Sequence, residues 1–326
     1  MSKLKFETAV ANQSGTMDID ILCCPVCKNI LNNSLYCSVC QIEFPVLNNV
    51  PILINEKNSI FSITDYTNVN IFSFFGKKKT KRGEVIRKLL PKSSINYIAK
   101  SNYALLNSLC PPFSRVLIVG GGVTGSGMKS FLSNPNIKII VTDVSFVEGI
   151  HIVCDCHDLP FQSDSFDCVI VQAVLEHVVD PYRCVEEIYR VLKEKGIVYA
   201  ETPFMQQVHG GAYDFTRFTW LGHRRLFRKF EDIKTGTCVG PGTALIWSWK
   251  YFLRSFSSNA IIMKILDVFA LVTSFYWKYF DYYLKNKSNS IDSASGIFFL
   301  GRKIDSYFLS DKELIKLYDQ KKKELS

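Results

Sequence analysis

The chain has 326 residues, of which 47% are hydrophobic and 21% charged, a balance that excludes collagen-like, low-complexity and disordered proteins. Its 39 basic and 30 acidic residues leave a net charge of +9, which permits an anionic partner without requiring one. The first twenty residues lack the apolar stretch of a signal peptide, and the uncharged runs 235–249 and 268–277 are shorter than the roughly 20 residues of a membrane-spanning helix. We therefore expect a cytoplasmic protein, either soluble or peripheral at a membrane.

The cysteines are concentrated near the N-terminus. Cys24 and Cys27 form one C-x-x-C pair, Cys37 and Cys40 form a second, and nine residues separate the two pairs. Each pair presents two thiolates to one ion from a tight turn, and two pairs complete a tetrahedral shell around zinc. The spacing therefore predicts a structural zinc ribbon over residues 21–56.

The segment around the four cysteines resembles the small zinc-binding activator subunit of tRNA and release-factor methyltransferases, and also ribbons fused to bacterial methyltransferases. The resemblance includes the sequences FPV at 44–46 and PILI at 51–54, which follow the cysteines. It implies a closed structural site, because four thiolates leave no open coordination position. Cys23 is expected to be a buried neighbour of this site, and residues 1–20 are expected to form a tail.

Residues 57–112 are predicted to be a linker with covering helices. Apolar residues recur at helical intervals from 83 to 109 and are interrupted by Pro91, which favours two helices near the mouth of the following domain. The basic run KKKTKR at 77–82 has two interpretations, a phosphate-contacting patch or a solvated turn ahead of a helix.

Strands and helices alternate from residue 113 onward. Strands are predicted at 114–119, 138–143, a short stretch before Asp155, 166–171, 197–201, 233–239 and 296–301, and helices at 181–192 and 220–230. This alternation predicts an α/β fold with a Rossmann-like, doubly wound sheet of seven strands. The core is expected over 113–239, a helical insertion over 240–293, and the last strand with a C-terminal tail over 294–326.

A glycine-rich loop follows the first predicted strand of the core. Gly120, Gly121 and Gly122 lie at the turn from strand to helix, where a chain without side chains can approach a ligand closely. Asp143 ends the next strand about 20 residues later, where a ribose diol is bound in nucleotide-binding folds. The loop alone is a weak signal, because several classes of nucleotide-binding protein share it.

Residues 113–204 resemble the type 11 group of class I S-adenosylmethionine-dependent methyltransferases. The elements D-x-x-x-LPF, SFD-x-V, LEHV-x-DP and RVLK-x-x-G of that group occur in order between Asp155 and Gly196. The resemblance implies that Gly120 and Gly122 hold the methionine end of S-adenosylmethionine. The other positions that it implies for the cofactor are Asp143 at the ribose, Asp155 and the backbone of Cys156 at the adenine, and Gln172 in the pocket wall. The chain departs from the group at Ile118, where an acid usually helps to hold the methionine amino group.

The loop after the fifth core strand, residues 202–219, is expected to overhang the transferred methyl group. It resembles a D-[FY]-x-R-[FY]-T element of methyltransferases encoded with polysaccharide-assembly enzymes, which implies a sugar-like acceptor. His209 is the candidate general base, Asp214 its orienter or an alternative base, and Arg217 an anchor for an acidic group. An equally weighted alternative is that Asp214 and Arg217 pair structurally and His209 only caps the loop. His177 is interpreted as a structural histidine at the turn from strand to helix.

The insertion carries two apolar helical stretches, 244–256 and 261–284. The apolar face of the second is wider than one packing surface covers, which suggests a homodimer interface, a lid over an apolar substrate or a shallow membrane contact through 244–285. The dimer interface is slightly preferred, although a lipid-linked glycan acceptor would reconcile membrane contact with the chemistry of the loop.

The preferred function is methyl transfer from S-adenosylmethionine to an oxygen or nitrogen of a glycan-related or other small molecule. One alternative is a tRNA or rRNA methyltransferase that docks RNA through the ribbon and the basic segments. The other is an inactive adenosylmethionine-binding interaction module.

Overall fold

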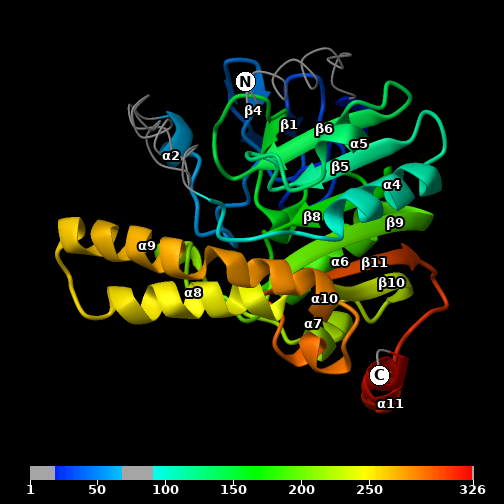
Figure 1. Cartoon of the computed structure of the whole chain (residues 1–326). Coiled ribbons are helices and arrows are strands. Elements are labelled where there is room, and N and C mark those ends of the chain that lie inside the picture. The colour runs from blue at the N-terminus through cyan, green and yellow to red at the C-terminus, as the bar shows by residue number, and fades with distance from the viewer. Residues whose placement is uncertain (1–18, 68–90, 325–326) are drawn as a thin grey trace.

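The structure is a computed structural model that describes residues 19–67 and 91–324 (Figure 1). The basic run at 77–82 and the first predicted linker helix lie outside the described residues. Within them, the centre of the molecule is a seven-stranded sheet in the order β7-β6-β5-β8-β9-β11-β10. Its strands are β5 (Arg115–Val119), β6 (Lys138–Asp143), β7 (Ile152–Val153), β8 (Phe166–Gln172), β9 (Leu192–Pro203), β10 (Phe230–Val239) and β11 (Gly296–Lys303).

The five strands from β7 to β9 are parallel, and β11 is antiparallel to both of its neighbours. This order confirms the predicted α/β methyltransferase fold. The helices of the described chain are α2 (Thr64–Thr67), α4 (Ala99–Leu109), α5 (Lys129–Leu132), α6 (Pro181–Val191), α7 (Trp220–Leu226), α8 (Pro241–Arg254), α9 (Ala260–Ser274), α10 (Asp281–Leu284) and α11 (Asp311–Glu324). The short 3₁₀ turns are η1 (Ile19–Ile21), η2 (Cys156–Asp158), η3 (Gly211–Tyr213), η4 (Phe275–Phe280) and η5 (Ser288–Asp292).

Two predicted helices end earlier than expected, and tertiary pairing explains both. Helix α6 begins after the N-cap Asp180 as expected, but β9 takes over at Leu192, because that residue pairs with Phe166 of β8 and is fully buried. Helix α7 ends at Leu226, before the predicted 230, because Phe230 begins β10 and pairs with Lys303.

The sheet buries a separate apolar cluster on each face. Alternate residues of β5 point to opposite sides, so Leu117 and Val119 belong to one cluster and Val116 and Ile118 to the other. The N-terminal ribbon packs on the first face and α4 on the second. Since the strands are covered on both sides, they read as continuous apolar runs in the sequence.

The ribbon is joined to the sheet by both its ends. It contains the short strands β1 (Tyr36–Cys37), β2 (Ile42–Glu43), β3 (Val46–Leu47) and β4 (Val50–Pro51). Near its start, Cys23 donates its backbone N–H to the carbonyl of Pro160 at 3.0 Å. At its end, Ile52 bridges Val153 in parallel, which places the PILI segment beyond β7 at the edge of the sheet.

Helices α8 and α9 run side by side and extend away from the sheet as a helical hairpin, defined here as residues 241–284 (Figure 1). Residues Ala260–Leu284 form a continuous helical stretch of 25 residues with a mean hydropathy of 1.6, of which only 11% is buried in its most apolar window. By length and composition this stretch could cross a membrane. The expectation that no segment is long enough was therefore wrong, because it counted uncharged runs and stopped at isolated charges such as Asp267 and Lys278.

Candidate functional site

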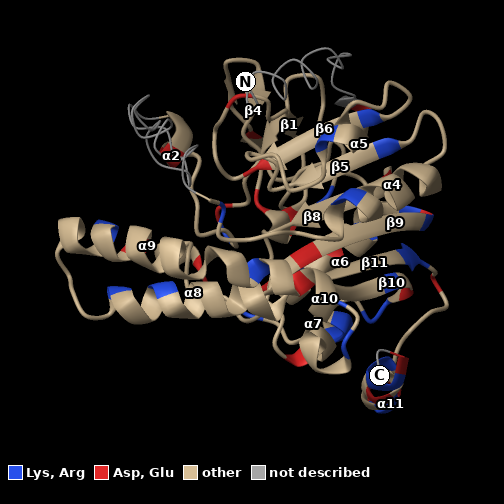
Figure 2. Cartoon of the chain, viewed as in Figure 1, with Lys and Arg blue, Asp and Glu red and all other residues tan. Residues whose placement is uncertain are grey.

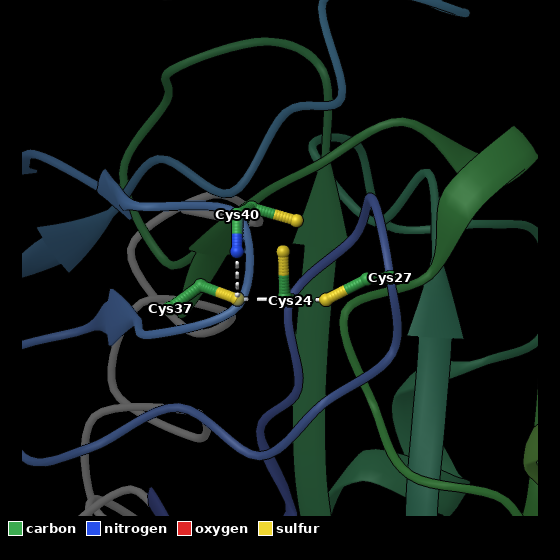
Figure 3. A group of neighbouring side chains, drawn as sticks. All are labelled: Cys24, Cys27, Cys37 and Cys40. Atoms are coloured by element: carbon green, nitrogen blue, oxygen red, sulfur yellow. Dashed lines mark hydrogen bonds between the residues drawn. The ribbon is translucent and has the colours of Figure 1, made fainter.

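The four cysteines of the ribbon converge on one point (Figure 3). Their sulfur atoms all lie within 4.8 Å of one another, and the Sγ atoms of Cys27 and Cys37 are 3.4 Å apart. Four thiolates at 2.3 Å from a tetrahedral zinc ion lie roughly 3.8 Å apart, so the donor set fits such an ion. The cluster is consistent with the predicted zinc site.

The backbone of the ribbon explains why the thiols converge. Lys28 and Gln41, which directly follow the second cysteine of each pair, adopt left-handed φ angles of 63° and 55° and complete two matching tight turns. The N–H of Cys40 donates to the sulfur of Cys37, which is 3.4 Å away. Cys23 is fully buried outside the cluster, as expected, and burial raises the pKa of its thiol to about 11.

A cavity of about 240 Å³ opens at the carboxyl ends of β5, β6 and β8. Four of the residues expected to bind the cofactor line it: Gly120, Asp143, Asp155 and Cys156. This is the edge at which parallel α/β sheets bind ligands, because each strand turns into its helix there.

The glycine loop is held in contact with β6. Gly120 has a φ of +67°, and a Cβ atom built on it would lie 2.2 Å from Val174, so a side chain does not fit there. Gly121 donates its N–H to the carbonyl of Thr142 at 2.9 Å. Gly122 donates to the Asp143 carboxylate at 2.8 Å. Gly121 and Gly122 therefore shape the loop, and Gly120 is the glycine that reaches the cavity wall.

The two acidic groups of the cavity have opposite electrostatic environments. Burial raises the pKa of Asp143, although the backbone N–H groups of Ser145 and Gly122 bind its carboxylate. Burial also opposes ionisation of Asp155, but hydrogen bonds from His157 and Ser59 outweigh it, so the pKa of Asp155 lies below its ordinary value. Both carboxylates are fixed in place, which suits hydrogen bonding to hydroxyl or amino groups of a ligand.

Gln172 does not line this cavity. Its side chain donates to Glu201 at 2.6 Å and accepts from the hydroxyl of Tyr103 at 2.8 Å. Burial raises the pKa of Glu201 in this network. Ile118 is buried in the cluster beneath α4.

One wall of the cavity comes from the segment predicted to be a linker. Ile60 and Phe61 line it, and the ring of Phe61 stacks on that of Tyr213 at 5.9 Å. Helix α4, the described part of the predicted covering helices, contributes no residue to the wall. The sequence around Phe61 has no periodicity, so no local signal distinguishes it from an ordinary connection.

Only one of the three predicted catalytic residues of the acceptor loop, residues 202–219, reaches the cavity. His209 lines the wall, whereas Asp214 and Arg217 do not. The Asp214 carboxylate accepts from the N–H groups of His209 and Gly210 at 2.7 and 3.0 Å and from the Arg217 guanidinium at 2.9 Å. Burial opposes ionisation, but the bond from Arg217 holds the pKa of Asp214 well below its usual range. The pair therefore fixes the shape of the loop.

Glu176 and His177, which lie in the loop after β8 and belong to the LEHV element, lie beside His209. The Nε2 atoms of His177 and His209 are 3.7 and 3.9 Å from one Glu176 oxygen. Glu176 is 1% exposed, and burial raises its pKa to about 8. Glu176 was not among the predicted site residues, and His177, which was predicted to be structural, lines the cavity.

Comparison with known proteins agrees with this geometry. Residues 119–200 match the family model described as "Methyltransferase domain". Over 100 residues the chain is 31% identical to 2-methyl-6-phytyl-1,4-hydroquinone methyltransferase 1 of Oryza sativa subsp. japonica. This aligned region is 26% of this chain and 29% of the relative. Over 71 residues it is 45% identical to demethylmenaquinone methyltransferase of Clavibacter sepedonicus. This aligned region is 21% of this chain and 28% of the relative.

The chain thus spans less than a third of the length of these two relatives. A crystal structure of a putative sarcosine dimethylglycine methyltransferase from Galdieria sulphuraria superposes with a TM-score of 0.43 and 15% identity, and covers 69% of this chain and 88% of that one. The family match confirms that the centre of the sheet is a methyltransferase domain.

Proposed function

We propose that this chain, which carries a methyltransferase domain, transfers a methyl group from S-adenosylmethionine to an oxygen or nitrogen of a small molecule. The observation that carries the proposal is the cavity at the strand ends, which Gly120, Asp143 and Asp155 line within the family match. S-adenosylmethionine supplies an electrophilic methyl group, so the protein has to bind the donor, orient the acceptor and accept or release one proton.

The roles of the residues follow from their positions. The bare backbone of Gly120 would approach the methionine end, Asp143 would accept hydrogen bonds from the ribose hydroxyls, and Asp155 with Cys156 would bind the adenine. His209 faces the cavity and is the group placed to take a proton from the acceptor, while Asp214 and Arg217 act as positioning residues behind it.

The acceptor that we favour is glycan-related and carried on a lipid. Of the polar groups expected for a sugar, the acceptor loop brings His209 to the cavity, and the helical hairpin touches that loop directly. Tyr251 of α8 donates its hydroxyl to the carbonyl of Val208 at 2.6 Å, and Trp247 packs on His209 with ring centroids 6.1 Å apart. The names of the two relatives, a phytyl hydroquinone and a demethylmenaquinone methyltransferase, support a small-molecule acceptor rather than RNA.

We expect the purified, zinc-replete protein to release S-adenosylhomocysteine when it is given a lipid-linked glycan in detergent. Release with RNA instead, together with RNA binding that weakens steeply with salt, would support the rival RNA methyltransferase. Binding of S-adenosylmethionine without turnover on any acceptor class would support an interaction module. The measurement is product release by mass spectrometry, with the lipid-free glycan as the matched control acceptor.

We further propose that the helical hairpin rests on an anionic membrane surface. Large apolar side chains of α9, including Ile261, Ile265 and Val272, are more than half exposed. Between residues 241 and 287 the chain has six basic and two acidic residues. Lys278 and Asp281 are buried, which leaves five basic residues and one acidic residue (Figure 2). An exposed apolar face with flanking cations is the pattern of an interfacial helix.

If the hairpin contacts a membrane, we expect the protein to float together with vesicles of mixed phosphatidylcholine and phosphatidylglycerol in a density gradient. Ile265→Asp should reduce the bound fraction at least about fivefold, because a charge is costly where an apolar side chain enters the acyl boundary. Ile315→Asp on α11 is the matched control, since Ile265 and Ile315 are 62% and 63% exposed on helices. A dimer that Ile265→Asp dissociates, with no vesicle binding by the parent, would contradict the proposal.

We also propose that the ribbon plays in this chain the part that the small activator subunit plays beside its methyltransferases. It shares an apolar cluster with the core strands and with α6, and Lys28 pairs with Glu187 of α6 at 2.8 Å. Its contribution would then be to the stability of the domain and not to the chemistry.

A further inference from the structure

We propose that Glu176, His177 and His209 form a second metal site, which binds a borderline divalent cation such as Zn²⁺, Co²⁺, Fe²⁺ or Mn²⁺ on the acceptor side of the cavity. The three side chains offer one carboxylate oxygen and two imidazole nitrogens within 4.8 Å of one another. This inference rests on the proposed function for its role in the reaction, but the binding of the ion is independent of that function.

The side chains already converge. The imidazole rings of His177 and His209 meet edge to face, with centroids 5.0 Å apart and planes at 82°. Their Nε2 atoms lie 3.7 and 3.9 Å from the same Glu176 oxygen. Ligands that are 2.0–2.2 Å from one ion lie roughly 3.0–3.5 Å apart, so each of these two distances to Glu176 would have to shorten by about half an ångström.

Glu176 supplies the second, independent observation. Its side chain is 1% exposed, and neither carboxylate oxygen has a hydrogen-bond partner among the described residues. A buried acid without partners is costly, and in native proteins it calls for an explanation such as an ion. The carboxylate is aimed at the two imidazoles, where a cation would satisfy it.

The surroundings of the histidines suit metal ligation. His177 pairs through Nδ1 with the carbonyl of Tyr213 at 2.7 Å, and a carbonyl partner assigns the proton to Nδ1 and leaves the Nε2 lone pair for a metal. Nδ1 of His209 is 3.3 Å from the carbonyl of Gln207. Arg217 is the nearby cation, 3.4 Å from the same Nδ1, and its pairing with Asp214 offsets its charge.

The open side of the site faces the cavity. His177 and His209 line the cavity wall, and Glu176 lies behind them. Two histidines and one carboxylate leave coordination positions free, unlike the four thiolates of the ribbon. An acceptor hydroxyl bound there would lose its proton to solvent more readily, so in the metal-loaded protein the ion replaces His209 as the group that activates the acceptor. Its oxygen would then form the new bond to the methyl carbon while the carbon–sulfur bond breaks and its electron pair returns to sulfur.

The test is a Co²⁺ titration of the purified full chain after its ribbon has been loaded with zinc. We expect one further equivalent of Co²⁺ with the visible absorption of nitrogen and oxygen ligands and without the thiolate charge-transfer band of a cysteine site. Glu176→Gln and His209→Ala should each weaken this binding at least tenfold. Exposed Glu148→Gln is the matched control and should leave it unchanged.

His209→Ala keeps the test valid if Glu176→Gln does not fold, because His209 is on the surface side of the site. No second equivalent in the parent protein, or equal binding by parent and His209→Ala, would overturn the metal site. Binding of S-adenosylmethionine is followed separately by calorimetry. If the protein binds the second Co²⁺ but does not bind S-adenosylmethionine, the proposed function is refuted and the metal site stands. If the protein transfers the methyl group of S-adenosylmethionine but binds no second Co²⁺, the metal site is refuted and the proposed function stands.

Discussion

The double variant Cys37→Ser, Cys40→Ser should lose its zinc and melt at a temperature lower by more than about 10 °C, since removing a structural metal costs several kcal/mol of folding free energy. The loss of stability should extend to the whole domain, because the ribbon shares its apolar core with the sheet. Leu22, Leu31 and Phe44 belong to the same apolar cluster as the core residues of β5 and β8. Loss of the ribbon would therefore expose part of this shared cluster to water.

The measurement is thermal unfolding by circular dichroism together with the zinc content of the purified protein. Cys23→Ala is the matched control, because Cys23 is buried in the same ribbon but lies outside the cluster. It should keep its zinc and cost only about 1–2 kcal/mol, the usual range for a small buried truncation. Equal melting temperatures for the double variant and this control would show that the cysteines hold no structural metal.

Gly120→Ala should lower the affinity for S-adenosylhomocysteine at least about 100-fold, because the added methyl group acts on both the backbone and the cavity wall. The φ of +67° disfavours any side chain, and the new Cβ would lie 2.2 Å from Val174, so the loop or the wall must shift. Both changes fall on the part of the cavity that we assign to the methionine end of the donor.

Calorimetric titration measures this effect, and Gly236→Ala is its matched control. Gly236 lies in β10, and a Cβ atom there meets its nearest neighbour at an ordinary 3.4 Å. The control should bind as the parent does, and both variants should keep the circular dichroism of the folded sheet. Undiminished binding by Gly120→Ala would place the donor elsewhere and remove the basis for the assigned roles of Asp143 and Asp155.

Local patterns predicted the elements but not all their ends. The continuous apolar run at Val116–Val119 is typical of a strand buried on both faces, and it is one. The C-x-x-C spacing brought four thiols together because the ligands of each pair lie within one turn of chain. By contrast, β9 starts at Leu192 because this residue pairs with Phe166 of β8. Phe166 is distant in the sequence, so the residues around Leu192 do not indicate this start.

The sequence alone determined that each core strand exists and about where it lies, where the glycine loop turns, and which cysteines form the ribbon, because these properties depend on neighbours a few positions away. Only the tertiary structure decided that Glu176 and His177 meet His209, that Phe61 walls the cavity, and that Gln172 turns away from it. Those side chains are set side by side by sheet order and by loops that return from distant parts of the chain. Contacts of that kind leave no periodic trace in the order of the amino acids.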